Sequence, residues 1–142
     1  TGAVRIEVTG TNGSTTATFQ IDVIAYNPAA LDLFPSSTIY PGGWLENSWF
    51  DWVAAEEIPF ITHLNHGYQY VDESSTTTTL FLYDFNLETW LYTTSTLYPN
   101  MYNFDLGKWM FYLKESGNGF TEDRWFWIYD GDNSRWVRES EI

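Results

Sequence analysis

Cysteine is absent from this sequence of 142 residues, which excludes disulfide bonds, thiol catalysis and thiolate metal sites. Basic residues are scarce: 6 Lys and Arg stand against 19 Asp and Glu, for a formal net charge of −13. A surface of this sign repels phosphate, so nucleic acid and anionic membrane surfaces are not expected as partners. No apolar run approaches membrane-spanning length, so we expect no membrane insertion.

Aromatic residues, by contrast, are abundant. Phe, Trp and Tyr make up 20% of the chain, which favours a packed fold over the disorder that a high net charge alone would suggest. Ser and Thr are frequent and strong helix formers are few, a balance typical of strands. The composition therefore predicts an all-β protein.

The segment VRIEVTGTNGSTTATFQIDV, residues 4–23, predicts a β-hairpin with Asn12 and Gly13 as the central turn residues. This turn sets Val8 opposite Ala17, Ile6 opposite Phe19 and Val4 opposite Ile21. All apolar residues then fall on one face and all polar residues on the other. The residues of the apolar face are Val4, Ile6, Val8, Phe19, Ile21 and Val23.

A two-stranded hairpin is marginal in water, so the apolar face requires a cover. Three partners could cover the apolar face: the rest of this chain, a preceding domain of a longer protein, or another copy that accepts the strands. The ending GSTTATFQIDV resembles the closing strands of immunoglobulin-like or cadherin-like repeats in large bacterial surface proteins. We therefore assign residues 1–26 to the hairpin and residues 27–43, which contain three prolines, to an irregular linker.

A repeat follows in residues 44–142. YDFNLETW, YNFDLGKW and YDGDNSRW each carry Tyr, then Asp or Asn, and Trp seven positions after the Tyr. Each copy is interpreted as strand, turn and returning strand. The paired repeat residues are Tyr83 with Trp90, Tyr102 with Trp109, and Tyr129 with Trp136.

Pairing Tyr83 with Trp90 also sets Phe81 opposite Tyr92 on the same face, and Leu82 opposite Leu91 on the other. Both faces would be apolar, as in strands that are covered on both sides. The segment ITHLNHGYQYV, residues 61–71, predicts a further, shorter hairpin. The domain expected here is an antiparallel array of aromatic hairpins.

From Trp44 onward, the segments WLENSWFDW, ITHLNHGYQYV, YDFNLETWLYTTSTLYPNMYNF and DRWFWIYD resemble an aromatic-rich C-terminal region of large secreted or surface proteins of aquatic Gram-negative bacteria. The sequence departs from that pattern at LKESGNGFTED, which is longer and more charged. The resemblance implies an extracellular setting and no known chemistry.

Signals of catalysis are weak. The many carboxylates fall in turns or on alternating polar faces, and no nucleophile elbow, phosphate loop or dinucleotide motif is present, so we predict no enzyme. His63 and His66 have a spacing that could bind a metal, but two histidines in a turn are more typical of plain loop residues.

Calcium binding is a second hypothesis that the sequence leaves open. Asp130 and Asp132 begin a segment with oxygen-bearing residues at several calcium-loop positions, although Arg135 stands where the loop requires glycine. A β-turn is the favoured interpretation, with calcium as the one cofactor that the acidic turns could hold.

Repeated aromatic residues could also stack on sugar rings; the candidates are Tyr83, Trp90, Tyr102, Trp109, Trp125, Tyr129 and Trp136. The leading hypothesis is a non-enzymatic, self-associating structural subunit of a bacterial extracellular or surface assembly. In a filament, residues 1–26 would donate strands to a neighbouring copy. The alternatives are a carbohydrate-binding module at the end of a surface protein and an inert domain of a longer parent.

Overall fold

A computed structural model of the chain describes residues 3–13, 15–24 and 27–142, without the side chains of residues 3–8, 15 and 19–24. The described part is nearly all β, as predicted. The strands are β1 (Ala3–Asn12), β2 (Thr15–Ile24), β3 (Ser37–Ile39), β4 (Trp44–Asn47), β5 (Asp51–Ala54), β6 (Phe60–His63), β7 (Gly67–Val71), β8 (Thr79–Asp84), β9 (Thr89–Thr94), β10 (Asn100–Asn103), β11 (Lys108–Tyr112), β12 (Trp125–Ile128) and β13 (Arg135–Arg138). The helices are α1 (Pro28–Leu33) and two 3-10 turns, η1 (Gly131–Asn133) and η2 (Glu139–Glu141).

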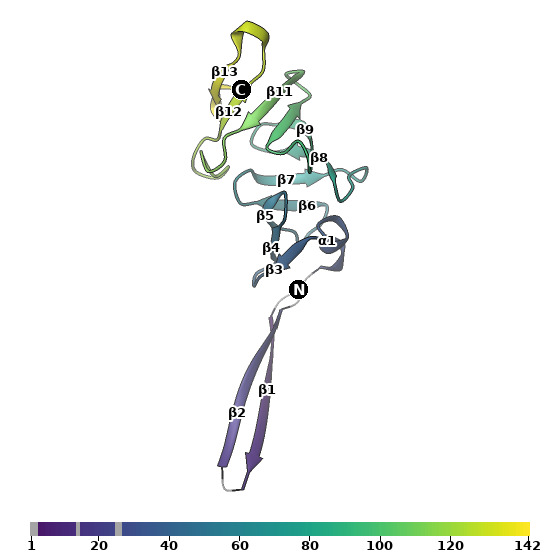
Figure 1. Cartoon of the computed structure of the whole chain (residues 1–142), viewed down its shortest axis with the longest axis vertical. Coiled ribbons are helices and arrows are strands. Elements are labelled where there is room, and N and C mark those ends of the chain that lie inside the picture. Colours follow the sequence, from purple (N-terminus) through teal and green to yellow (C-terminus); the bar gives the residue numbers. More distant parts are fainter. Residues whose placement is uncertain (1–2, 14, 25–26) are drawn as a thin grey trace.

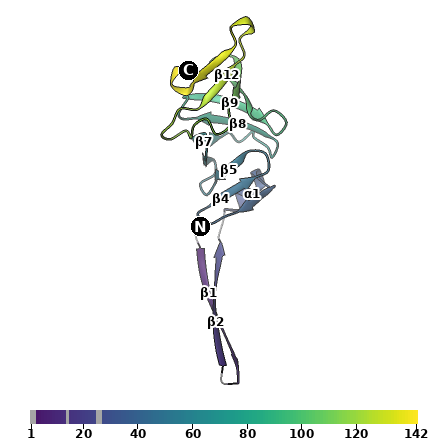
Figure 2. The same cartoon turned by 60° about the vertical axis from the view of Figure 1, so that its left-hand side comes forward.

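The strands form two separate sheets. β1 and β2 make a two-stranded antiparallel sheet, while β3 to β13 make an eleven-stranded antiparallel sheet whose strand order follows the chain. Figures 1 and 2 show the β1–β2 hairpin extending away from the large sheet, at the opposite end of the molecule from β12 and β13. Among the described helices, none is long and apolar enough to cross a membrane.

Residues 27–43, which we expected to form an irregular linker, contain two regular elements. Asn27 caps the helix α1 by accepting the N–H of Ala29 at 3.0 Å, and Pro28 occupies the first helical turn, where its missing N–H costs nothing. β3 then pairs with β4, so the large sheet begins at Ser37 rather than at Trp44. Phe34, at the end of α1, is buried in the core.

The β1–β2 hairpin forms as predicted, but the predicted register is wrong by two residues. Asn12 pairs with Thr15, so Asn12 ends its strand instead of opening the turn. The observed register sets Val8 opposite Phe19, Ile6 opposite Ile21, and Arg5 opposite Asp22. Opposite charges at directly opposed positions stabilise an antiparallel pair, which favours this register. A shift of two preserves the alternation, so the assignment of residues to faces is unchanged.

Four hairpin turns of the large sheet share one device: a buried side chain at the end of the first strand accepts backbone N–H groups of the turn. Asn47 Oδ1 accepts from Trp49 and Phe50 at 3.2 and 3.0 Å. The equivalent acceptors are His63 Nδ1, Asp84 Oδ1 and Asn103 Oδ1. These contacts replace water for turn amides that face the core.

Each of these acceptors is followed, four residues later, by a residue with positive φ. The four are Asp51 (59°), Gly67 (78°), Glu88 (54°) and Gly107 (63°). A left-handed residue at this point lets the chain reverse and enter the returning strand. The repeat therefore includes the β4–β5 and β6–β7 hairpins, and the predicted hairpin within residues 61–71 is confirmed.

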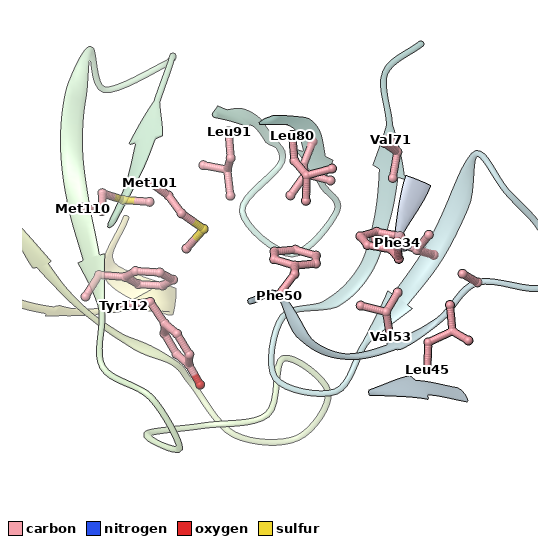
Figure 3. Packing of buried hydrophobic residues seen from close by; sticks show 14 of the residues in the cluster. Phe34, Leu45, Phe50, Val53, Val71, Leu80, Leu91, Met101, Met110 and Tyr112 are labelled. Carbon is pink, nitrogen blue, oxygen red and sulfur yellow. The ribbon is translucent and has the colours of Figure 1, made fainter. Parts of the chain in front are cut away.

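The large sheet curls around a core on its inner face. Aliphatic residues at alternate strand positions are fully buried there, among them Leu45, Leu80, Leu82 and Leu91. Figure 3 shows Phe50 in the middle of this core, with Met101, Met110 and Tyr112 on one side and Phe34 and Val53 on the other. The turn that Asn47 caps thus places an aromatic ring between the two halves of the curled sheet.

The predicted pairs of the first two repeats are confirmed: Tyr83 lies opposite Trp90 and Tyr102 opposite Trp109. The pair predicted for the third repeat is wrong, because Trp136 lies opposite Trp127 instead of Tyr129. The turn in this repeat contains η1, which changes the register of the returning strand by two residues.

Candidate functional site

The outer face of the large sheet is aromatic, whereas the inner face is mostly aliphatic. Register places the outer residues in rows that run across the strands. Row A consists of Phe60, Tyr70, Tyr83, Trp90 and Phe104. Row B consists of Phe81, Tyr92, Tyr102, Trp109 and Tyr129. The last member of each row follows the end of a strand and continues the ladder through its backbone N–H.

Several rings within each row are in contact. In row A, Tyr83 meets Trp90 edge to face with centroids 5.5 Å apart, and Tyr70 meets Trp90 at 6.1 Å. In row B, Tyr102 meets Trp109 at 5.4 Å in a similar arrangement. Such pairs contribute about 0.5–1.5 kcal/mol each beyond simple burial, so the rings stiffen one another.

The prediction that the strands are covered on both faces is wrong for the outer face. Trp90 is 39% exposed and Phe104 is 49% exposed, although the aromatic pairing itself is as predicted. Aromatic rings that lie edge to face bury much of each other's surface, and this replaces a second layer. An exposed apolar surface of this extent is typical of an interaction site.

A hollow of about 320 Å³ lies on the outer face, where the two rows meet. It is lined by Phe81 of row B, by Trp90 and Phe104 of row A, and by Asp72 and Ser74 of the β7–β8 loop. Asp72 accepts hydrogen bonds from the backbone N–H of Ser74, at 2.9 Å, and from its hydroxyl. These bonds lower the pKa of Asp72, so its carboxylate is charged at neutral pH.

The other predicted stacking residues lie on the same outer face. Trp136 is 42% exposed and packs edge to face on Trp127 at 5.5 Å. Trp125 is half-buried beneath the guanidinium of Arg138, 5.5 Å from its centroid. The structure therefore brings Tyr83, Trp90, Tyr102, Trp109 and Tyr129 into two continuous rows, and places Trp125 and Trp136 beyond them.

A buried polar network lies on the inner side of the sheet, and sequence reasoning missed it. The guanidinium of Arg124 forms two hydrogen bonds to the Asp84 carboxylate, at 2.8 and 3.1 Å, and both side chains are fully buried. Arg124 Nε donates to Glu139 at 2.8 Å. Burial opposes the charge of Arg124, but Asp84 and then Glu139 outweigh it and raise the pKa of Arg124.

The network continues through the two histidines. Arg124 donates to His66 Nδ1 at 2.9 Å, so His66 carries its proton on Nε2, which lies 3.1 Å from the Tyr98 hydroxyl. His63 Nδ1 accepts the N–H groups of Asn65 and His66, so its Nε2 donates to the Phe50 carbonyl at 2.8 Å. Hydrogen bonds within the protein thus occupy all four ring nitrogens.

Burial sets the protonation of both rings. It lowers the pKa of His63 to about 4. Burial is also the main reason that the pKa of His66 lies well below 6.5, and the neighbouring His63 ring and the Arg124 guanidinium lower it further. Burial likewise raises the pKa of Tyr98 above its usual value. Neutral, enclosed imidazoles with every nitrogen bonded are suited to fixing turns, and the reading of His63 and His66 as plain loop residues is wrong.

The network fixes the segment between β11 and β12 against two distant turns. Asn86 of the β8–β9 turn donates to the carbonyl of Gly119, and a Cβ on Gly119 would lie 2.5 Å from the carbonyl carbon of His66. Only glycine is suited to position 119, because a side chain would collide with the backbone of His66 and because a φ of +66° is unfavourable for other residues. A short spacing motif could not have revealed a contact between Asp84 and Arg124, which lie forty positions apart.

The structure gives one of the two acidic candidates for calcium a basic partner. The Asp130 carboxylate pairs with Lys108 Nζ at 3.0 Å, and Asp132 is exposed in η1. In residues 3–13, 15–24 and 27–142, no three His, Cys, Asp or Glu side chains are grouped in a way that could hold a metal ion. Calcium binding by Asp130 and Asp132 stays a prediction.

The predicted assembly residues lie on β1 and β2, whose backbone is described. The side chains of Val4, Ile6, Val8, Phe19, Ile21 and Val23 lie outside the described residues. Within the described residues, β1 and β2 pair with each other and with no strand of the large sheet. In the part of the chain that the structure describes, the large sheet thus supplies no third strand to the hairpin.

Comparison with known proteins gives no assignment: no protein-family model, curated protein or solved structure matches this chain.

Proposed function

We propose that this chain is a non-enzymatic structural module of a bacterial extracellular or surface assembly, and that it joins a neighbouring copy through β1 and β2. One observation carries the proposal: two ten-residue strands pair only with each other in the described structure. Each strand has one edge of free backbone groups, which is the feature that strand addition uses.

The sequence of the hairpin supports the same proposal. Six large apolar residues alternate with polar ones, and burying them contributes of the order of 10 kcal/mol. This gain is comparable with the cost of bringing two molecules together. Because the hairpin and the β12–β13 end lie at opposite ends of the molecule (Figure 1), a head-to-tail contact of this kind would propagate into a filament.

Light scattering on three versions of the chain tests the proposal. We expect Ile6→Lys/Ile21→Lys, which places charges on the apolar face, to give monomers while the parent chain assembles. The control Thr9→Lys/Thr18→Lys carries the same added charge on the other face, where the two hydroxyls lie 3.3 Å apart, and should still assemble. Assembly that persists after deletion of residues 1–26 would refute the proposal.

A second candidate function is carbohydrate binding, and the two exposed aromatic rows of the outer face favour it. Saturable quenching of tryptophan fluorescence by a polysaccharide would support this function, and it can be measured on the truncated chain, independently of assembly. Unchanged fluorescence across a panel of polysaccharides would count against it.

A further inference from the structure

The hollow between rows A and B has the composition of a ligand site. Phe81, Trp90 and Phe104 surround it. Each of them packs on a ring outside the hollow: Phe81 on Tyr92, Trp90 on Tyr70, and Phe104 on Tyr102 of row B. Trp90 is held by Tyr70 and Tyr83 and still exposes 39% of its surface. A platform fixed in advance loses little freedom when a ligand binds.

Polar groups stand beside these rings. The ionised Asp72 carboxylate accepts hydrogen bonds, and the Ser74 hydroxyl lies next to it. Ligand pockets combine an aromatic lining with a few polar groups that fix orientation, and a volume of about 320 Å³ lies at the small end of their range. A pyranose ring offers both matching features: a face of C–H groups for the rings, and hydroxyls for the carboxylate.

We propose that the hollow binds one sugar unit of a neutral, linear polysaccharide, and that the rest of the polymer lies across the strands along row A. The proposal rests on the second candidate function and gives it a site. The net charge of −13 repels anionic polymers, so we do not expect them as ligands.

The dimensions of row A fit a polymer rather than a single sugar. Its five members lie on or directly after five neighbouring strands of the sheet. The four spacings between these strands give the row a length of roughly 19 Å. Two strand spacings, roughly 10 Å, match the disaccharide repeat of an extended β-1,4-linked chain. Such a chain presents the same ring face at each repeat, as a row of aromatic residues requires.

A second and larger hollow, of about 510 Å³, does not fit this ligand. It lies between α1, the β5–β6 turn and the β7–β8 loop, and the residues that line it include Leu33, Ile58, Pro59 and Val71 but no aromatic ring. Stacking, which is the main source of affinity for a sugar face, has no partner there. The site at Trp90 is therefore the one to test.

The experiment measures retention of the whole chain by cellulose, chitin and galactomannan, with alginate as the anionic comparison. Trp90→Ala and Phe104→Ala should each weaken retention about tenfold or more, as expected for central aromatic contacts. Trp136→Ala is the matched control, since Trp136 is exposed to nearly the same extent, 42% against 39%, and lies outside the hollow. Circular dichroism and melting temperature verify that each variant folds.

Each outcome is decisive. Retention by a neutral polymer that falls with Trp90→Ala and Phe104→Ala but not with Trp136→Ala supports the site. If neither variant weakens retention, the proposed site is wrong, although carbohydrate binding stands. If Trp90→Ala does not fold, the retention of Phe104→Ala alone decides whether the hollow is the site. Displacement by tetramethylammonium would identify a cation cage instead. Retention by alginate alone overturns the neutral ligand, and no retention at all removes carbohydrate binding but leaves the assembly proposal intact.

Discussion

The two sheets of this protein differ in the length of their edge strands. The outermost strands of the large sheet are short: β3 has three residues between Pro35 and Pro41, and β13 has four. Proline and short length both discourage the addition of further strands. The strands β1 and β2 have ten residues each, and in the described structure neither has a second neighbour.

One backbone donor on the free edge of β13 is bonded within the chain. Glu139 N–H donates to the Arg124 carbonyl at 2.8 Å, so by alternation the N–H of Arg138 points to the free edge. There it donates to the carboxylate of Glu141 at 2.8 Å, within the same chain. The comparison teaches that the large sheet keeps its outer edges short, whereas the two edges of the hairpin are ten residues long.

The largest effect should come from the buried ion pair that fixes the large sheet. Arg124→Met leaves the Asp84 carboxylate buried without its partner, and we expect the free energy of unfolding to fall by about 3–5 kcal/mol. Urea unfolding followed by tryptophan fluorescence measures this. The control Lys108→Met removes a pair with Asp130 that is exposed to water, and should cost less than about 1 kcal/mol. Equal losses in both variants would show that the network does not hold the sheet.

A smaller effect, confined to the large sheet, should follow from pH. The pKa of His63 is about 4 in the folded protein and about 6.5 unfolded, so on acidification the unfolded chain takes up the proton first. Stability is then complete above pH 6.5 and falls as the pH approaches 4. We expect His63 alone to account for about 2 kcal/mol between pH 7.5 and 5.

Urea midpoints at these two pH values measure the change. His63→Asn is the matched variant, because asparagine performs the same capping role at positions 47 and 103 and does not titrate. The variant should show a flatter dependence on pH, with the contribution of His66 remaining. An identical slope in the parent and in His63→Asn would contradict this assignment. Residues 1–26 contain no histidine, so the hairpin takes no direct part in the change.

The sequence predicted local pairing well and long-range contacts not at all. The pairs Tyr83–Trp90 and Tyr102–Trp109 follow from turn residues and alternation within a few positions. The β1–β2 register failed because a motif of two turn residues competes with a second arrangement that keeps the same faces. Both are local questions, decided by small energy differences.

The candidate site was only half visible in the sequence. The aromatic residues of rows A and B could be recognised, but not their exposure, because a strand with two apolar faces is normally buried on both. The capping repeat was hidden because Asn47, His63, Asp84 and Asn103 are different residue types with one role. The partner of Asp84 is brought near only by the curl of the whole sheet, which no local pattern encodes.

The smallest effect sharpens the comparison most. Deleting residues 1–26 removes two strands that pair only with each other in the described structure, so the large sheet should keep its melting temperature and its unfolding free energy within about 0.5 kcal/mol. Calorimetry on the truncated chain, under conditions where the parent is monomeric, measures this. A marked loss would mean that the hairpin contributes to the stability of its own sheet, and the distinction between a complete sheet and an incomplete hairpin would fail. An unchanged sheet, together with loss of assembly, would show that β1 and β2 serve a partner rather than their own chain.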